Sequence, residues 1–241
     1  NKLSEKKETL VIISDKKSLS KIDGLSKNIL NPIKEAIVNE NFNFKKLDSI
    51  KIIGGGKGGY SKVIIIGSGN SSDLSFRDLD LIGGKVTQLN NNSISSIDVL
   101  ISKNIATDDS ILRIGYGAVL ATYRFDKYKT KKVKVSLPKA IKIFSKRHQS
   151  LSKQFIHKKS VAEGVFLARD LVNEPSNILN PEDYAKRIKA LSSYGLKIEI
   201  LNEAKMKKLG MDSLLGVGRG SQYDSQLVIM KWEGIKNKKT K

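Results

Sequence analysis

The stretch Ala-Arg-Asp-Leu-Val-Asn-Glu-Pro-Ser-Asn-Ile-Leu-Asn-Pro, at residues 168–181, predicts the end of one helix and the start of another. Pro175 disfavours helical backbone at the residue before it, so the first helix should end near Asn173. Asn180 is a favourable N-cap, and Pro181 suits the first helical position because its missing N–H would have no helical partner. The stretch therefore predicts a sharp turn between two α/β patterns.

Upstream of this turn, short apolar runs rich in β-branched residues alternate with helical patterns. Strands are predicted at 9–13, 50–53, 62–66 and 97–101, and helices at 29–38, 76–89 and 108–123. Strands that alternate with helices predict a mostly parallel sheet that helices cover on both faces. We expect residues 1–150 to form one α/β domain.

A long amphipathic pattern follows this first domain. Apolar residues recur with a helical period from Gln154 to Val172, which amounts to about five turns. We expect residues 151–174 to form a helix that bridges two domains.

Residues 175–241 are expected to begin a second α/β domain. Helical spacing predicts a helix over 181–194, and alternation predicts a strand over 196–200. The run 227–230 is continuously apolar, which is typical of a strand buried on both faces. Such a strand needs neighbouring strands and covering helices, yet only 235–241, mostly Lys and Asn, follow it. We therefore expect this second domain to be incomplete.

Composition excludes several classes of protein. The chain has 241 residues and no cysteine, which rules out disulfides, thiolate catalysis and thiolate metal ligands. No apolar run approaches the roughly 18 residues that a membrane span requires. We expect a cytoplasmic protein with no membrane segment.

The net charge of +20, from 44 basic and 24 acidic residues, could attract nucleic acid. Most of the basic residues are Lys, and they are spread from Lys2 to Lys241. Arg, which recognises phosphate or guanine with two hydrogen bonds, is scarce. We therefore expect a Lys-rich solvated surface and no specific nucleic-acid site.

Two glycine-rich segments resemble nucleotide-binding loops but fail on spacing. In 54–61, Lys57 is followed by two glycines and a tyrosine, whereas a phosphate loop needs Ser or Thr there and a helix after it. In 67–69, a dinucleotide fingerprint would need a third glycine where Ser72 stands. We expect a mobile turn at the first segment and a structural role at the second.

No polar cluster has the spacing of a catalytic or metal site. His148 and His157 have no second histidine or acid at ligand spacing, so we expect both on the surface. Ser221 lacks the Gly-x-Ser-x-Gly setting of a nucleophile. Structural roles are expected for the remaining candidates, namely helix capping or solvation for Asp78, Asp80, Asp108 and Asp109, and an ion pair or cap contact for Arg169 and Asp170.

The stretch at 168–181 resembles the signature of the leucyl aminopeptidase (cytosol aminopeptidase) family of metallopeptidases, approximately Ala-Arg-x-Leu-x-Asn-x-Pro-x-Asn-x-x-x-Pro. The matching residues are Arg169, Leu171, Asn173, Pro175, Asn177 and Pro181. The resemblance continues, in the same order as in the family, through 117–129, 210–211, 217–221 and 227–234. It covers nearly the whole chain.

This resemblance implies a three-layer, macro-like N-terminal α/β domain, a bridging helix and the start of an α/β catalytic domain. Family members remove N-terminal residues from peptides, form hexamers and bind two divalent metals, Zn or Mn, between which a bridging water attacks the carbonyl. The metal motifs, Val-Gly-Lys-Gly-x-x-x-Asp-x-Gly-Gly and Asn-Thr-Asp-Ala-Glu-Gly-Arg, do not occur in this sequence. No catalytic, metal or cofactor-binding residue can therefore be assigned, and the signature residues Arg169, Asn173, Pro175, Asn177 and Pro181 are expected to be structural.

We therefore expect the N-terminal part of a truncated aminopeptidase that is inactive alone. Two alternatives remain open at this point. The chain could be a stand-alone basic binding module for nucleic acid or an ADP-ribose-like ligand, or it could be a decayed gene product.

Overall fold

The computed structural model describes residues 9–19, 22, 25, 27–53, 60–89, 96–131 and 137–234. The chain divides into two compact units, Asn1–Phe166 and Leu167–Lys241. None of the described helices is both long enough and apolar enough to span a bilayer.

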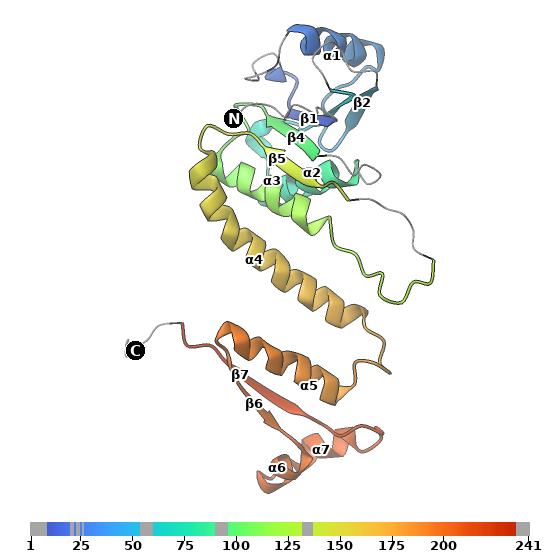
Figure 1. Ribbon diagram of the computed structural model, residues 1–241, viewed down its shortest axis with the longest axis vertical. Helices are drawn as coiled ribbons and strands as arrows, with labels where there is room; N and C mark the ends of the chain where they lie inside the picture. Colours follow the sequence, from blue (N-terminus) through green and yellow to red (C-terminus); the bar gives the residue numbers. More distant parts are fainter. Residues whose placement is uncertain are drawn as a thin grey trace. The chain divides into compact units, whose positions relative to one another are not determined.

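The first unit is built on a five-stranded sheet in the order β2-β3-β1-β4-β5 (Figure 1). The strands are β1 (Thr9–Ser14), β2 (Ser49–Ile53), β3 (Lys62–Gly67), β4 (Ser96–Ile101) and β5 (Ala140–Ile143). All neighbours are parallel except β2 and β3, which are antiparallel. The predicted mostly parallel sheet is confirmed, while β5, only four residues long, is a strand that the sequence did not predict.

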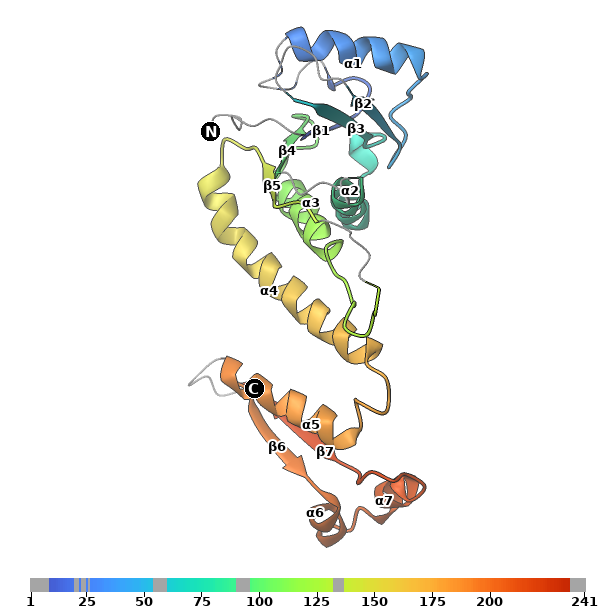
Figure 2. The ribbon, with the colours of Figure 1, turned by 45° about the vertical axis from the view of Figure 1, so that its right-hand side comes forward.

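Helices cover both faces of this sheet, with α1 (Lys27–Asn39) on one face and α2 (Phe76–Gln88) and α3 (Asp108–Leu120) on the other (Figure 2). Successive residues of a strand point to opposite faces, so a central strand must be apolar throughout. In β1, Leu10 and Ile12 join the core beneath α1, while Val11 and Ile13 join the core beneath α2 and α3. The continuous apolar runs of the sequence thus become a two-sided core.

Glycines bring α2 and α3 into backbone contact. A Cβ atom at Gly83 would lie 2.0 Å from the carbonyl oxygen of Ile114, and one at Gly117 would lie 1.9 Å from that of Asp80. Both helices begin with a capped turn, because the side chain of Ser75 accepts from the N–H of residue 78 and that of Thr107 accepts from the N–H of residue 110. The two covering helices are therefore closely packed against each other.

Helix α4 (His148–Asn173) contributes residues to both units. It ends at Asn173, as the proline after it predicted. Leu151 and Ala162 are buried on the part of the helix that belongs to the first unit.

The second unit contains a two-stranded antiparallel sheet. Its elements are α5 (Pro181–Ala190), the 3-10 helix η3 (Leu191–Tyr194), β6 (Lys197–Leu201), α6 (Glu203–Lys208), α7 (Asp212–Gly218) and β7 (Leu227–Lys231). The side chain of Asn180 accepts a 2.9 Å hydrogen bond from the N–H of Asp183, and Pro181 opens α5. Gly195 ends the helical segment with a φ of 96°, which favours glycine. The predicted helix start and stop are confirmed.

Burial in β7 differs from the prediction. The run 227–230 was expected to be buried on both faces, but Ile229 is 45% exposed and Met230 is 53% exposed. The expectation is wrong for this structure because β7 pairs with β6 alone among the described strands. β7 therefore has the apolar composition of a central strand, but among the described strands it has a neighbour on one side only.

Candidate functional site

The signature residues lie on the surface of the turn between α4 and α5. Arg169, Asn173, Pro175, Asn177 and Pro181 are all exposed. The turn itself is closed by the backbone, because the carbonyl oxygen of Pro175 accepts hydrogen bonds of 2.9 Å from the N–H groups of residues 178 and 179.

A buried ion pair that the sequence did not predict also holds this turn. The guanidinium of Arg187, on α5, lies 3.1 Å from the carboxylate of Glu174, whose side chain is only 3% exposed. A carboxylate buried to this degree requires a partner. This contact joins the last turn of α5 to the residue that follows α4, which is a positioning role.

A second polar group lies at the carboxyl ends of β1 and β4, the edge where open α/β sheets bind ligands. The carboxylate of Asp15 accepts from the N–H of Ser18 at 2.8 Å and from the side-chain amide of Asn104. Asn104 in turn accepts from the hydroxyl of Ser102 at 2.9 Å. Because these groups bind one another, they tie the two strand ends together, and we assign no ligand to them.

Gly67 and Gly69, which follow β3, have the structural role expected of them. A Cβ atom at Gly67 would lie 2.4 Å from the carbonyl oxygen of Lys45, and the N–H of Gly69 donates to the carbonyl oxygen of Phe44 at 2.9 Å. Backbone atoms of Phe44 and Lys45 therefore pack directly against Gly67, where a side chain would clash. The glycine run at 54–59, including Lys57, lies outside the described residues.

Asp78 has the capping role expected of it. Its carboxylate accepts from the backbone N–H and the hydroxyl of Ser75, at 2.9 and 2.7 Å, and lies 2.9 Å from the ammonium of Lys46. The hydrogen bond from Ser75, followed by the contact with Lys46, lowers the pKa of Asp78 to about 2.

The other acidic candidates form ion pairs or lie at a helix start. Asp80 lies 3.2 Å from the guanidinium of Arg113, while burial raises the pKa of its carboxyl group above the ordinary value. Asp108, in the first turn of α3, lies 2.7 Å from Arg147. Asp109 occupies the same turn, where negative charge meets the positive end of the helix dipole.

The residues present do not fit a divalent metal centre within the described part of the chain. No group of three or more His, Cys, Asp or Glu converges there. His148 and His157 are both exposed, as predicted. We therefore derive no metal-dependent step from this chain.

A cavity of about 430 Å³ in the first unit lies between α3, β5 and α4. Its walls are mainly aliphatic, and Phe155 of α4 closes one side against Gly115 of α3. His148 and Ser152 add polar atoms. The cavity offers an apolar surface that the sequence did not predict.

The second unit exposes large apolar side chains around β7. We define the β7 surface as Ile229, Met230 and Trp232, of which Trp232 is 64% exposed. Consecutive strand residues point to opposite faces, so the exposed Ile229 and Met230 lie on opposite faces of β7, while α5 contacts both β6 and β7. This surface is the most distinctive feature of the second unit.

Two family models match the chain one after the other. The N-terminal domain of the cytosol aminopeptidase family matches residues 10–132, and the catalytic domain of the same family matches residues 166–241. The chain belongs to the cytosol aminopeptidase family. The family resemblance of the 168–181 signature is thereby confirmed.

Curated relatives agree with this assignment. A probable cytosol aminopeptidase of Rickettsia rickettsii (strain Sheila Smith) is 37% identical over 97% of this chain, and one of Caulobacter vibrioides (strain ATCC 19089 / CIP 103742 / CB 15) is 39% identical over 74% of it. These alignments span 49% and 36% of the relatives. The chain thus spans about half the length, or less, of these two relatives.

Solved structures share the fold of this chain. A mutant of tomato leucine aminopeptidase matches 98% of the chain and 50% of its own length, with a TM-score of 0.79 and 21% identity. The bottromycin maturation enzyme BotP, in complex with Mn, matches 94% of the chain and 45% of its own length, with a TM-score of 0.72 and 18% identity. At these identities the similarity establishes the fold and leaves the activity to other observations.

Proposed function

We propose that this chain is the N-terminal part of an aminopeptidase that removes N-terminal amino acids from peptides in the cytoplasm. The observation that supports this most is the succession of the two family domains along the chain, at 10–132 and 166–241. We propose residues 1–150 as the N-terminal domain, 151–174 as the bridging helix and 175–241 as the start of the catalytic domain.

We propose that the reaction is peptide hydrolysis dependent on two divalent ions, Zn or Mn, which would supply activation of water and polarisation of the carbonyl; we assign no described residue of this chain to hold either ion. We propose that the described residues of this chain have a structural role in the enzyme rather than a catalytic one. Glu174, after the end of α4, lies 3.1 Å from Arg187 of α5, and Asn180 caps α5. We infer that the groups that bind metal and substrate lie outside this chain, and that the whole protein forms a hexamer.

An activity measurement tests the proposal. The purified 241-residue chain, supplied with Mn²⁺ or Zn²⁺, should release no amino acid from leucine p-nitroanilide above the rate of a blank. The same assay on the chain joined to the rest of a family member should show metal-dependent release. Hydrolysis by the 241-residue chain at a rate comparable with that of the joined protein would contradict the proposal that the groups that bind metal and substrate lie outside this chain.

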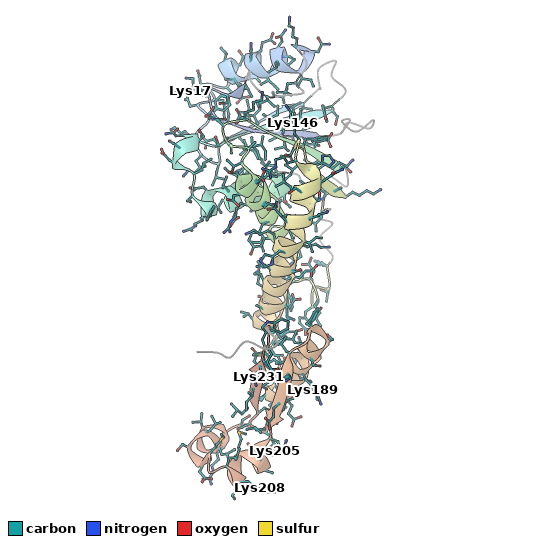
Figure 3. The ribbon with its side chains drawn as sticks, turned by 90° about the vertical axis from the view of Figure 1, so that its left-hand side faces the viewer. Lys17, Lys146, Lys189, Lys205, Lys208 and Lys231 are labelled. Carbon is teal, nitrogen blue, oxygen red and sulfur yellow. The ribbon has the colours of Figure 1, made fainter. Side chains whose placement is uncertain are left out.

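The exposed lysines do not favour a nucleic-acid function. Lys17 and Lys146 lie on the outside of the first unit, and Lys189, Lys205, Lys208 and Lys231 lie on the outside of the second (Figure 3). Charge spread over several elements of both units gives nonspecific attraction that salt weakens. We therefore expect retention on heparin at low salt and its loss at moderate salt, with no saturable binding to a defined nucleic acid.

A further inference from the structure

The cavity between α3, β5 and α4 has the size of a binding site for a small molecule. Its volume of about 430 Å³ lies within the roughly 300–1,000 Å³ that small-molecule pockets occupy. Its described lining residues all belong to the first unit, where α3 and β5 lie beside the N-terminal half of α4 (Figure 1, Figure 2). The cavity is therefore formed within one compact unit.

The walls of the cavity favour an aliphatic ligand. All three elements contribute aliphatic side chains, among them Val119 from α3, Ile141 and Ile143 from β5 and Leu151 from α4. Apolar surface of this kind gains free energy when a ligand displaces water from it. Phe155 is the single aromatic residue in the described lining, so no pair of rings is present between which a planar ligand would stack.

Polar and basic groups lie at the end of the cavity where α4 begins. His148 and Ser152, which are both exposed, line the cavity and also line an adjoining surface hollow with Gln149, Ser150 and Lys153. Among the described residues of these two linings, His148 and Lys153 are the titratable side chains, and no Asp or Glu occurs. The group that complements this end in charge is therefore an anion.

The acidic residue beside this end does not reverse that preference. Asp108 of α3 lies outside both linings, and its carboxylate is 2.7 Å from the guanidinium of Arg147, which offsets its charge. The hydroxyl of Ser152 and the imidazole of His148 can both donate hydrogen bonds to a carboxylate. Because both residues are exposed, a carboxylate there keeps contact with water while an attached chain is buried.

We propose that this cavity binds an aliphatic monocarboxylate, with the chain between α3, β5 and α4 and the carboxylate at His148 and Ser152. The proposal concerns the first unit and is independent of the proposed function. A free aliphatic acid and the C-terminal residue of a peptide that ends in an aliphatic side chain share this chemistry, and the ligands compared below distinguish them.

Titration of the full 241-residue chain with sodium octanoate tests the proposal. With ¹³C-labelled isoleucine methyl groups, the resonances of Ile111, Ile141 and Ile143, which line the cavity, should shift and reach saturation. Those of Ile12 and Ile65, in the core on the other face of the sheet, should stay in place. The pattern of shifts locates the bound chain.

A series of ligands separates the contributions of the chain and the charge. Butyrate should bind at least tenfold more weakly than octanoate, because it buries fewer methylene groups. Octylammonium should bind at least fivefold more weakly, because its charge has the sign of the basic groups at the mouth. Tighter binding of octanoate than of N-acetylleucine would identify a free acid as the ligand, and the reverse order would identify a peptide end; either order supports the proposed chemistry.

Matched variants of α4 test the mouth of the cavity. Ser152→Phe places a ring across it and His148→Glu gives it a negative charge, so each should weaken octanoate binding at least fivefold, and His148→Glu should strengthen octylammonium binding. Ser160→Phe and His157→Glu are the controls, since they make the same changes at exposed positions of α4 outside the lining. All four positions are exposed, so each variant should remain folded.

Four results would overturn the proposal. They are the absence of saturable shifts with octanoate, equal shifts of Ile12 and Ile65, equal affinity for octanoate and octylammonium, and equal weakening by the control variants. The first two would show that the cavity holds no such ligand, and the last two that binding does not depend on charge at His148 or on access beside Ser152.

Discussion

The two units of this chain differ in how far they bury the apolar residues of their strands. In the first unit, the central strand β1 buries all six of its residues between helices on both faces of the sheet. In the second unit, the equally apolar β7 leaves Ile229 and Met230 about half exposed. The difference shows that an apolar run indicates a strand that can be buried. The strands and helices that pack around it determine how far its side chains are buried.

The largest expected contrast is between two isoleucines, one from each unit. Ile65 of β3 is 0% exposed, so Ile65→Ala should lower the free energy of unfolding by about 2–5 kcal/mol. Ile229→Ala, at an exposed position, should change it by no more than about 0.5 kcal/mol. Urea unfolding followed by far-ultraviolet circular dichroism measures the free energy of unfolding of both variants. Equal decreases in the two variants would contradict the difference in burial between the units.

A smaller effect is expected where α2 and α3 touch. Gly83→Ala places a Cβ atom 2.0 Å from a backbone oxygen, so it should cost about 1–3 kcal/mol as the helices move apart. Gly164→Ala in α4 is the matched control, because a Cβ atom there meets nothing within 4 Å. The control should be neutral or stabilise the protein by up to about 1 kcal/mol. Thermal unfolding of the two variants distinguishes close packing from helix propensity.

The sequence predicted most of the first unit because its elements follow from local periodicity. Apolar alternation and capping residues such as Asn180 depend on neighbours in the chain, so they can be recognised without a structure. By contrast, β5 is only four residues long, and α7 contains two glycines, so neither gives a clear periodic signal.

Contacts between distant residues could not be predicted. Asp15 and Asn104 are 89 residues apart, and Tyr60 donates a 2.9 Å hydrogen bond to Asp98, 38 residues away, within a buried setting that raises the pKa of Tyr60. Glu174 and Arg187 are closer, at 13 residues, but a proline turn separates them. Each pair is brought together by topology rather than by spacing.

The exposure of β7 could not be predicted either. The apolar composition of 227–230 indicated a buried strand. The same composition is also compatible with a partly exposed strand. Burial of such a run depends on the strands and helices that pack around it, and the composition of 227–230 does not specify them.

The smallest predicted effect concerns the cap of α2. Ser75→Ala removes the N-cap of that helix and should cost about 1 kcal/mol at pH 7. In the folded protein the pKa of Asp78 is about 2 rather than 3.8, so the stability it contributes is present above about pH 4 and is lost as the pH falls toward 2. The difference between wild type and variant should therefore shrink between pH 4 and pH 2.

Ser72→Ala is the control for this titration, because the hydroxyl of Ser72 bonds to the exposed Asp73 and caps no helix. Its unfolding free energy should follow that of the wild type at every pH. If the free energies of unfolding of wild type and Ser75→Ala differed by the same amount from pH 7 to pH 2, protonation of Asp78 would not affect the contribution of the Ser75 cap to stability.

The most direct test of the central claim is hydrogen exchange of the 241-residue chain alone, resolved to the strands of both units. Amides in β1 and β3 should open only with the unfolding of the first unit, while those in β6 and β7 should exchange at least about a hundredfold faster, because few buried contacts stabilise them. Equal protection of β7 and β1 in the monomeric chain would contradict the account, since it would show that the second unit is stable without a partner.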